Sequence, residues 1–410
     1  MKKTKATIFF IVFISATLRI SAQRTVVNLV AKMDVRPQYE LWDGNEVMLM
    51  GFTKLFGTPL SLPSPTLVFN EGDSVEIKLR NMSQSAPHTI HLHGLDVDQK
   101  TDGVPNLSFS VPHDSTGSYI FKAPHAGTYL YHCHVISTIH VQAGMYGVII
   151  VNPPDGSNTT WEGGYAYDSE NTWMMSELDS FWHQYNYIHM EGQHEHTNGT
   201  PILDYNPQYF LINGKSEKQL KGPDNSIISK IDETVYLRLV NIGYYGNRIS
   251  LPEGLNAKVI SSDGRPLPAA YDTDTLEMYP GERYGLLLQP SEVFEDSIQI
   301  TYFDLNTQIS KSIQQMPVKV SEVNGLNTGL VSKGLNIYPN PFKNEVYIST
   351  NNLHSYILTV SSMNGAEIMQ LEVSDHLELQ KLDMADLSAG IYILNINTEA
   401  SSQNFRIIKN

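Results

Sequence analysis

Histidine and cysteine are concentrated in one short region of this 410-residue sequence. Two segments stand out, His88-x-x-His91-x-His93-Gly94 and His132-Cys133-His134, and the second is followed by His140 and Met145. Imidazole nitrogens and thiolate sulfurs are ligands for copper and zinc. Because this cysteine is the only one, it cannot form an internal disulfide. It is a buried spectator, an intermolecular partner or a metal ligand.

Strand geometry would sort these side chains into two groups. Successive side chains of a strand point to opposite faces, so His91 and His93 share one face and His88 points to the other. Likewise, the two histidines beside Cys133 share a face, and Cys133 points to the other. If the two strands lie side by side, His88 and Cys133 meet on one face. The four remaining histidines meet on the opposite face.

The first predicted metal site, called the first set below, consists of His88, Cys133, His140 and Met145. Two imidazoles, one thiolate and a weak axial thioether define a type 1, or blue, copper site for electron transfer. The thiolate is required because a neutral thiol is a poor ligand. The alternative is a buried free cysteine among hydrogen-bonded histidines.

The second predicted site, called the second set, consists of His91, His93, His132 and His134. Four imidazoles suit copper and, less well, zinc. The alternative is a half-site that binds no metal. Asp96, Asp98 and Asp102 follow the first histidine segment. One of them could orient a ligand histidine or relay protons, although aspartate in this context is commonly a turn residue.

The elements that must position these ligands are strands. Short runs rich in Val, Ile, Tyr and Leu alternate with Gly, Pro, Asn and Asp, and no long stretch has helical periodicity. This pattern predicts an all-β protein built from sandwiches or barrels. The predicted divisions are a copper-binding domain at 23–155, a second β domain at 165–322, a linker at 323–334 and a small β-sandwich at 335–410.

The N-terminal segment has the layout of a signal peptide. Lysines near Met1 precede an apolar stretch from Ala6 to Leu18, and Ser21-Ala22 offers a cleavage site, so residues 1–22 are expected to be removed on export. About 13 apolar residues are too few to span a bilayer. The formal net charge of −15 argues against a nucleic-acid or anionic-membrane partner.

The two histidine segments resemble the copper motifs of multicopper oxidases. Thr101-Asp102-Gly103-Val104-Pro105 resembles the first cupredoxin domain of that family, and residues 209–215 and 280–284 resemble its copper-free middle domain. The resemblance implies two cupredoxin-like Greek-key domains. It implies type 1 copper at the first set, which takes electrons from a small-molecule reductant near the His140 ring edge. His132, Cys133 and His134 would carry them to type 2 or type 3 copper at the second set, where dioxygen is reduced to water.

Two features depart from this family. The loop from Cys133 to His140 is longer than usual. In addition, the family's trinuclear cluster uses eight histidines from two domains, and the first domain of this chain supplies four. The missing ligands could come from a histidine group near the start of the second domain, although a polar surface loop is the simpler interpretation of that group. Its members are His183, His189, His194 and His196.

Other arrangements would also complete the second set. Two subunits of a homo-oligomer could pool their first-domain histidines. The second set could also be a mononuclear type 2 copper, as in copper nitrite reductases, which this domain also resembles. Those enzymes carry a catalytic aspartate three residues after the first type 1 histidine. His91 occupies that position here, which argues against nitrite reduction.

About the last 75 residues resemble the type A sorting domain of the type IX secretion system of Bacteroidetes. The resemblance lies in Leu335-Asn336-Ile337-Tyr338-Pro339-Asn340-Pro341, in Leu387-Ser388-Ala389-Gly390 and in the terminal Phe405-to-Asn410. It implies export through the periplasm to the cell surface or medium by the type IX machinery. The sequence therefore predicts a secreted copper oxidoreductase of the multicopper oxidase type. The alternatives are a non-catalytic blue copper carrier or copper-binding protein and a nitrite reductase-like enzyme.

Overall fold

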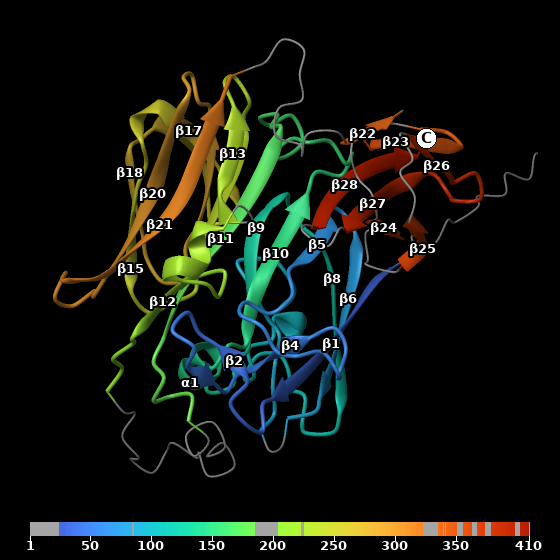
Figure 1. The fold of residues 1–410 in the computed structure, drawn as a ribbon. Helices are drawn as coiled ribbons and strands as arrows, with labels where there is room; N and C mark the ends of the chain where they lie inside the picture. The colour runs from blue at the N-terminus through green and yellow to red at the C-terminus, as the bar shows by residue number, and fades with distance from the viewer. Residues whose placement is uncertain are drawn as a thin grey trace, which may run out of the picture. The chain divides into compact units, whose positions relative to one another are not determined.

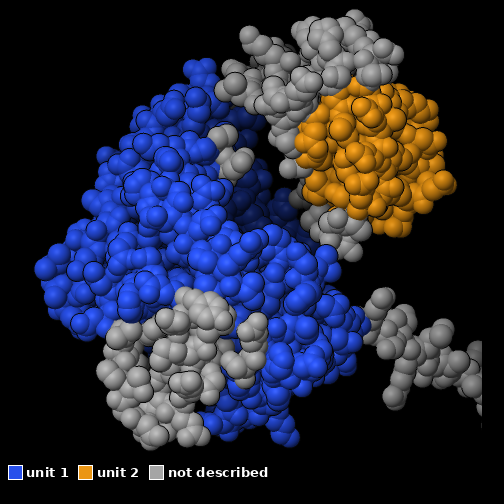
Figure 2. Space-filling model, turned by 60° about the horizontal axis from the view of Figure 1, so that its bottom comes forward, with its two compact units in different colours: residues 1–323 blue, residues 324–410 orange. Residues whose placement is uncertain are grey.

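The computed structural model describes residues 24–83, 86–184, 204–222, 225–322, 335–338, 340, 342–350, 356–362, 367–373, 379–397 and 402–409. The chain divides into two compact units, residues 1–323 and residues 324–410 (Figure 2). Regular structure in the described residues is almost entirely β, which confirms the predicted all-β class. No helix among the described residues is both long and apolar enough to cross a membrane. The expected signal peptide lies outside the described residues.

The first sandwich pairs two four-stranded sheets (Figure 1). One sheet has the order β4 (Met50–Thr53), β1 (Thr25–Met33), β6 (Ser74–Asn81) and β8 (Thr116–Lys122). The other has the order β5 (Leu67–Asn70), β10 (Tyr146–Asn152), β9 (Gly127–His132) and β7 (His91–His93). In β6 the residues alternate strictly between buried and partly exposed, so that every second side chain enters the core between the sheets.

The second sandwich has a six-stranded and a five-stranded sheet. The larger has the order β12 (Tyr209–Ile212), β11 (Ser169–Leu178), β14 (Val235–Asn241), β19 (Arg283–Leu288), β16 (Lys258–Ser262) and β17 (Arg265–Asp272). The smaller has the order β13 (Ile227–Lys230), β21 (Ser310–Ser321), β20 (Phe294–Phe303), β15 (Gly246–Ser250) and β18 (Thr275–Met278). Each sandwich has its own apolar core.

A third apolar cluster joins the two sandwiches. It contains Leu130 and Val148 from the first sandwich and Met174, Leu211 and Val240 from the second. Burial of these side chains against one another holds β9 and β10 next to the larger sheet of the second sandwich. The strand that ends at His132 is therefore fixed by contacts on both sides.

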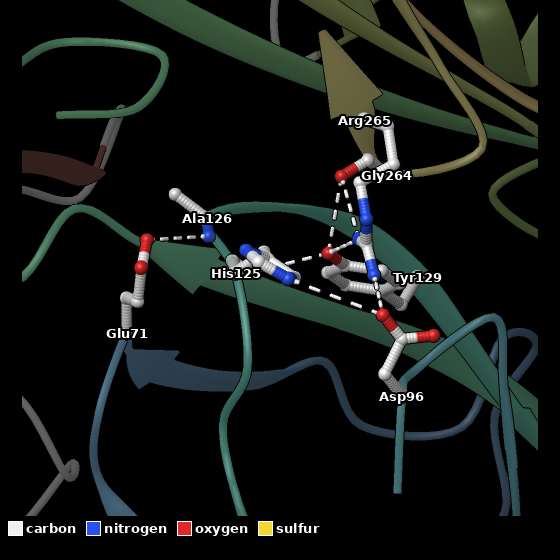
Figure 3. Close-up of polar contacts among 7 residues, drawn as sticks. All are labelled: Glu71, Asp96, His125, Ala126, Tyr129, Gly264 and Arg265. Atoms are coloured by element: carbon white, nitrogen blue, oxygen red, sulfur yellow. Dashed lines mark hydrogen bonds and ion pairs between the residues drawn. The ribbon is translucent and has the colours of Figure 1, made fainter. Parts of the chain in front are cut away.

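Polar contacts reinforce this junction near the histidines (Figure 3). Arg265 of the second sandwich donates one hydrogen bond to the hydroxyl of Tyr129, at 2.5 Å, and another to the carboxylate of Asp96, at 2.6 Å. The Tyr129 hydroxyl also lies 3.1 Å from the carbonyl oxygens of His125 and Gly264. Because Asp96 follows β7 and Tyr129 lies in β9, one arginine ties both histidine-bearing strands to the second sandwich.

A buried carboxylate lies at the same junction. Glu177 of β11 is 3% exposed, and one of its oxygens accepts the backbone N–H groups of Tyr244 and Tyr245. Burial is the dominant influence and raises the pKa of Glu177 to about 7, against the opposing effect of these two hydrogen bonds. The other titratable groups around this carboxylate are tyrosines, among them Tyr205, which hydrogen-bonds to the Glu177 carbonyl. Near neutral pH, Glu177 therefore exchanges between the acid and the carboxylate.

This pKa predicts a specific pH dependence of stability. The folded chain binds the Glu177 proton more tightly than the unfolded chain, so this residue's contribution to the free energy of unfolding falls as pH rises from about 4.5 to about 7. The loss is at most about 3 kcal/mol. Glu177→Gln removes this pH-dependent contribution. The free energy of unfolding of the variant, relative to that of the natural chain, should therefore be higher at pH 8 than at pH 5. Guanidinium unfolding of both metal-free proteins at the two pH values measures this. Parallel pH profiles would contradict the assignment.

The C-terminal unit is a separate small sandwich. One sheet has the order β22 (Leu335–Tyr338), β23 (Glu345–Thr350) and β26 (Leu379–Asp383). The other has the order β25 (Glu367–Val373), β24 (Tyr356–Ser362), β27 (Gly390–Asn397) and β28 (Ser402–Lys409). Its core includes Phe342, Val346 and Leu394, which are at most 1% exposed.

Candidate copper centres

Strands β7 and β9 pair in the register that the histidine spacing requires. They are antiparallel, with His91 opposite His132, Leu92 opposite Tyr131 and His93 opposite Leu130. Opposite residues of a strand pair place their side chains on the same face, so His91 and His132 project together. Leu92 and Tyr131 point to the other face and are fully buried in the core.

The second set comes together on this face. The ring of His91 lies 5.0 Å from that of His132 and 5.2 Å from that of His134, measured between centroids. Nδ1 of His93 is 3.2 Å from Nε2 of His132. One nitrogen from each of His91, His93 and His132 falls within 4.8 Å of the others, so the three side chains could hold one metal ion. His134 stacks against His132, with a centroid distance of 6.0 Å.

Backbone carbonyls fix the orientation of two of these rings. Nδ1 of His91 lies 2.8 Å from the carbonyl oxygen of Asp102 and 3.4 Å from its carboxylate, and Nδ1 of His132 lies 3.0 Å from the carbonyl oxygen of Cys133. A bond at Nδ1 directs Nε2 toward the metal position. Of the three aspartates noted in the sequence, the structure places Asp102 in this orienting position.

The second set is electrostatically suited to metal binding. Burial lowers the pKa of His132 to about 3 and that of His93 to about 4, and the nearby Arg283 guanidinium adds to the effect on His93. Burial also lowers the pKa of His91. Neutral imidazole is the form that binds metals, so these rings are available as ligands at neutral pH without first losing a proton.

The first set forms on the opposite side of Cys133. Sγ of Cys133 is 3.2 Å from Nδ1 of His140 and 3.6 Å from Nδ1 of His88, and none of the three side chains is exposed. Burial disfavours the thiolate, but His140 and His88 outweigh it and hold the pKa of Cys133 well below its ordinary value. Nε2 of His88 bonds to the Ser83 hydroxyl at 2.7 Å, which turns Nδ1 toward the sulfur.

The loop after Cys133 contains a short helix and supplies two further residues of the first set. Helix α1 (Ser137–Gln142) carries His140, and Met145 follows it with a fully buried side chain. Main-chain bonds join Cys133 N–H to the Met145 carbonyl at 3.0 Å and Met145 N–H to the His140 carbonyl at 2.9 Å. Gly144 has φ +114°, and a Cβ there would lie 2.8 Å from the Met50 carbonyl oxygen, so the turn requires glycine.

The structure corrects two expectations about individual histidines. His140 is completely buried, so its ring edge is not the solvent contact that the sequence suggested. His183 does not join the second set, because its Nδ1 lies 2.6 Å from the Met48 carbonyl and its Nε2 lies 3.1 Å from the Gln142 carbonyl. The other proposed completing residues, His189, His194 and His196, lie outside the described residues.

The second set opens onto a cavity of about 250 Å³ between the two sandwiches. Its lining residues are His93, His132, Ser137, Thr138, Val141, Ile242, Gly243, Tyr244, Pro280 and Gly281. Gly281 of the second sandwich approaches His93 so closely that a Cβ would lie 3.2 Å from the ring. Within this described lining, the second sandwich contributes no histidine, cysteine or carboxylate. The metal position therefore has imidazoles on one side and open space on the other.

Comparison with known families agrees with this geometry. The multicopper oxidase family matches residues 45–156 and again residues 173–311, so it covers both histidine sets and most of the second sandwich. The chain belongs to the multicopper oxidase family. The secretion system C-terminal sorting domain matches residues 336–410, which confirms the predicted tail and its implication of export to the cell surface or medium.

Several multicopper oxidases and related copper proteins are similar to this chain. L-ascorbate oxidase of Cucurbita pepo var. melopepo is 28% identical over 299 residues, which are 64% of this chain and 49% of that protein. Copper resistance protein A of Escherichia coli is 38% identical over 117 residues, or 28% of this chain and 18% of that protein. The chain thus spans about half the length of the first of these relatives and less than a fifth of the second.

Solved multicopper oxidase structures share the fold. Blue copper oxidase of Nitrosomonas europaea superposes with a TM-score of 0.56 at 25% identity and covers 73% of this chain and 86% of that one. Copper nitrite reductase of the same organism superposes with a TM-score of 0.53 at 20% identity, covering 73% of this chain and 94% of that one. Because both enzyme types share the architecture, the choice between their activities depends on the ligand residues.

Sequence reasoning missed two residues that contact or influence the ligand histidines. The Ser83 hydroxyl orients His88, and the Arg283 guanidinium lies beside His93. Serine and arginine carry no metal-ligand signature. Ser83 lies five residues before His88, within a segment that shows no strand pattern, and Arg283 lies far along the chain from His93. The predicted pairing of the two histidine-bearing strands does not by itself predict the contacts of Ser83 and Arg283.

Proposed function

We propose that this chain is a secreted copper-dependent oxidoreductase that takes single electrons from a small-molecule reductant at the first set and uses dioxygen as acceptor at the second. The observation that carries this proposal is the position of Cys133. Its sulfur faces His88 and His140, while the peptide bonds on either side of it lead to His132 and His134. The two ligand sets are thus connected through the covalent chain of adjacent residues.

The residues present fit copper at both positions. A low-pKa thiolate with two imidazoles and a buried thioether matches type 1 copper, and three imidazoles beside an open cavity match a copper position with room for a small ligand. Copper held there would supply one-electron redox chemistry and a place for dioxygen to bind. The chain contributes a buried first set, orientation of His91 and His132 by carbonyl oxygens, and access for a small molecule at the second set.

Completion of the second set is also a proposal. We expect a second copy of the chain to face the cavity and pool its own histidines, because the lining from the second sandwich offers no ligand. His189, His194 and His196 remain the alternative within one chain. If neither adds ligands, His91, His93 and His132 form a mononuclear type 2 position.

The alternative with a specific observation in its favour is a blue copper electron carrier. The absence of ligands from the second sandwich in the cavity lining would be expected if the second set bound no metal. Nitrite reduction is less compatible, because His91 stands where those enzymes carry an aspartate.

Copper stoichiometry combined with paramagnetic resonance tests the proposal. We expect one type 1 signal per chain, additional copper at the second set, and oxygen uptake when a phenolic donor is supplied. Size measurement by sedimentation should give an oligomer. One type 1 copper and no other metal, without oxygen uptake, would contradict the oxidase and favour the carrier.

A further inference from the structure

A pocket of about 530 Å³ opens on the surface between the β2–β3 hairpin of the first sandwich and the segment that follows β11 (β2, Tyr39–Glu40; β3, Glu46–Val47). We call it the Met48 pocket. Its lining residues are Val35, Arg36, Pro37, Asn45, Glu46, Val47, Met48, Ser180, His183, Gln184 and Tyr209. None of these residues belongs to either ligand set.

One wall of the Met48 pocket contacts the helix that carries a ligand of the first set. His183 lies in that wall, is 2% exposed, and its Nε2 lies 3.1 Å from the carbonyl oxygen of Gln142. Gln142 is the last residue of α1, the helix that carries His140. Nδ1 of His140 in turn lies 3.2 Å from Sγ of Cys133. The imidazole of His183 therefore connects a surface pocket to the helix that supplies a first-set ligand.

A second connection starts from the same wall. Nδ1 of His183 lies 2.6 Å from the carbonyl of Met48. Two residues further on, Met50 N–H bonds to the carbonyl of Ala143 at 2.9 Å, next to the Gly144-Met145 turn. A neutral imidazole has one N–H, so His183 donates to one of these two carbonyls and only contacts the other. In either tautomer the ring lies between the pocket and the residues around the first set.

Burial of the first set makes such a connection necessary. His88, Cys133 and His140 are each 0% exposed, so a reductant in solvent does not reach any of these three ligands in this structure. This inference rests on the proposed function. We infer that the Met48 pocket binds the reductant, and that the reductant's electron passes by way of the His183 ring to α1 and His140.

The lining indicates the class of reductant. Val35, Pro37, Val47 and Met48 provide apolar surface, and Asn45, Ser180 and Gln184 provide hydrogen-bonding groups. The single cation in the lining, Arg36, is matched by the single anion, Glu46. Ligand pockets of this size and mixed character take small, largely apolar molecules with a few polar groups. A neutral diphenol of one or two rings fits this description.

The transfer is balanced as one electron and one proton. A hydroquinone bound in the pocket gives up one electron, which reduces Cu(II) at the first set to Cu(I). Its phenolic proton passes to water at the open mouth of the pocket, and the phenoxyl product leaves. His183 ends the step in the protonation state in which it began.

Binding is tested first on the metal-free chain, which cannot oxidise the probe. Nuclear magnetic resonance titration with hydroquinone should shift ligand and pocket signals, and Val35→Trp should weaken binding on the order of tenfold by filling the pocket. Val35 is 62% exposed, so the larger ring is tolerated. Val293→Trp places the same ring at a 52% exposed site of the second sandwich and should bind hydroquinone as the natural chain does.

Electron transfer is tested on the copper-loaded chain without oxygen. Stopped-flow bleaching of the blue band by saturating hydroquinone should slow by about tenfold or more in His183→Gln. The blue spectrum and bleaching by dithionite should stay unchanged, and the saturating concentration removes any effect of the substitution on hydroquinone binding. Equal bleaching rates in the natural chain and His183→Gln, or equal hydroquinone binding by the natural chain and Val35→Trp, would overturn the inference and leave the proposed function standing. If hydroquinone binds but bleaches neither the natural chain nor the variants, both this inference and the proposed function are wrong.

Discussion

Replacing Cys133 with serine is expected to abolish the blue absorption band and to lower the copper content by one ion per chain. The thiolate is the strongest ligand of the first set, and its sulfur lies within 3.2–3.6 Å of both histidine nitrogens. A serine hydroxyl does not ionise at neutral pH and does not give the charge-transfer absorption of copper bound to thiolate. Oxidation of hydroquinone should fall to background, because His132 and His134 then lose their link to the first set. Absorption spectra and copper analysis measure the change.

A matched variant separates loss of the ligand from the cost of burying a hydroxyl group. Ala123 is 1% exposed and belongs to the same apolar core as Cys133. Ala123→Ser adds a hydroxyl to that core without touching either ligand set, and it should keep the blue band. A blue band of normal intensity in Cys133→Ser would refute the assignment of the first set.

The grouping of the ligands could be predicted because it depends on local geometry. A period of two residues along β7 places His91 and His93 on one face, and the pairing of His91 with His132 follows once the two segments are neighbouring strands. The same rule sends Cys133 to the opposite side. The assignment of side chains to faces requires no distant residue, whereas the adjacency of the two strands was an assumption, with which the sheet order agrees.

The burial of His140 could not be predicted, because it depends on contacts between distant segments. Helix α1 has six residues, too few for a periodic pattern in the sequence. It is held by contacts from His183, 41 residues beyond Gln142, and from Tyr244, whose hydroxyl bonds to the Thr138 carbonyl at 2.5 Å. The sequence gives the type of each residue, but only the folded chain places the second sandwich over the helix.

The same limit applies to the surroundings of the second set. The strand runs of the second sandwich indicated a β-sandwich or barrel, but not that the turn at Gly281 would lie against His93. That approach depends on the apolar junction and on Arg265, which bonds to Tyr129 and Asp96 of the first sandwich (Figure 3). Arg265 lies 136 residues from Tyr129, a separation over which local patterns predict no contact.

Replacing both His91 and His93 with alanine should separate the two ligand sets functionally. The change removes two of the three imidazoles whose nitrogens lie within 4.8 Å of one another, and His132 alone does not hold the ion. The second-set copper should be lost, and oxygen uptake should fall by at least about 100-fold. The first set shares no ligand with these residues, so the blue band should remain and should still bleach with hydroquinone. Once bleached, it should no longer return when air is admitted.

The recovery of colour in air is the decisive measurement for this variant, because it isolates the passage of electrons from Cys133 to the second set. His125→Ala is the matched control, since its side chain is 52% exposed and its ion-pair distance to Asp96 is 3.9 Å. That variant should bind the natural amount of copper and recover its colour at the natural rate. If the double variant recovers as fast as the control, electrons reach oxygen without the second set, and the function proposed for its four histidines is wrong.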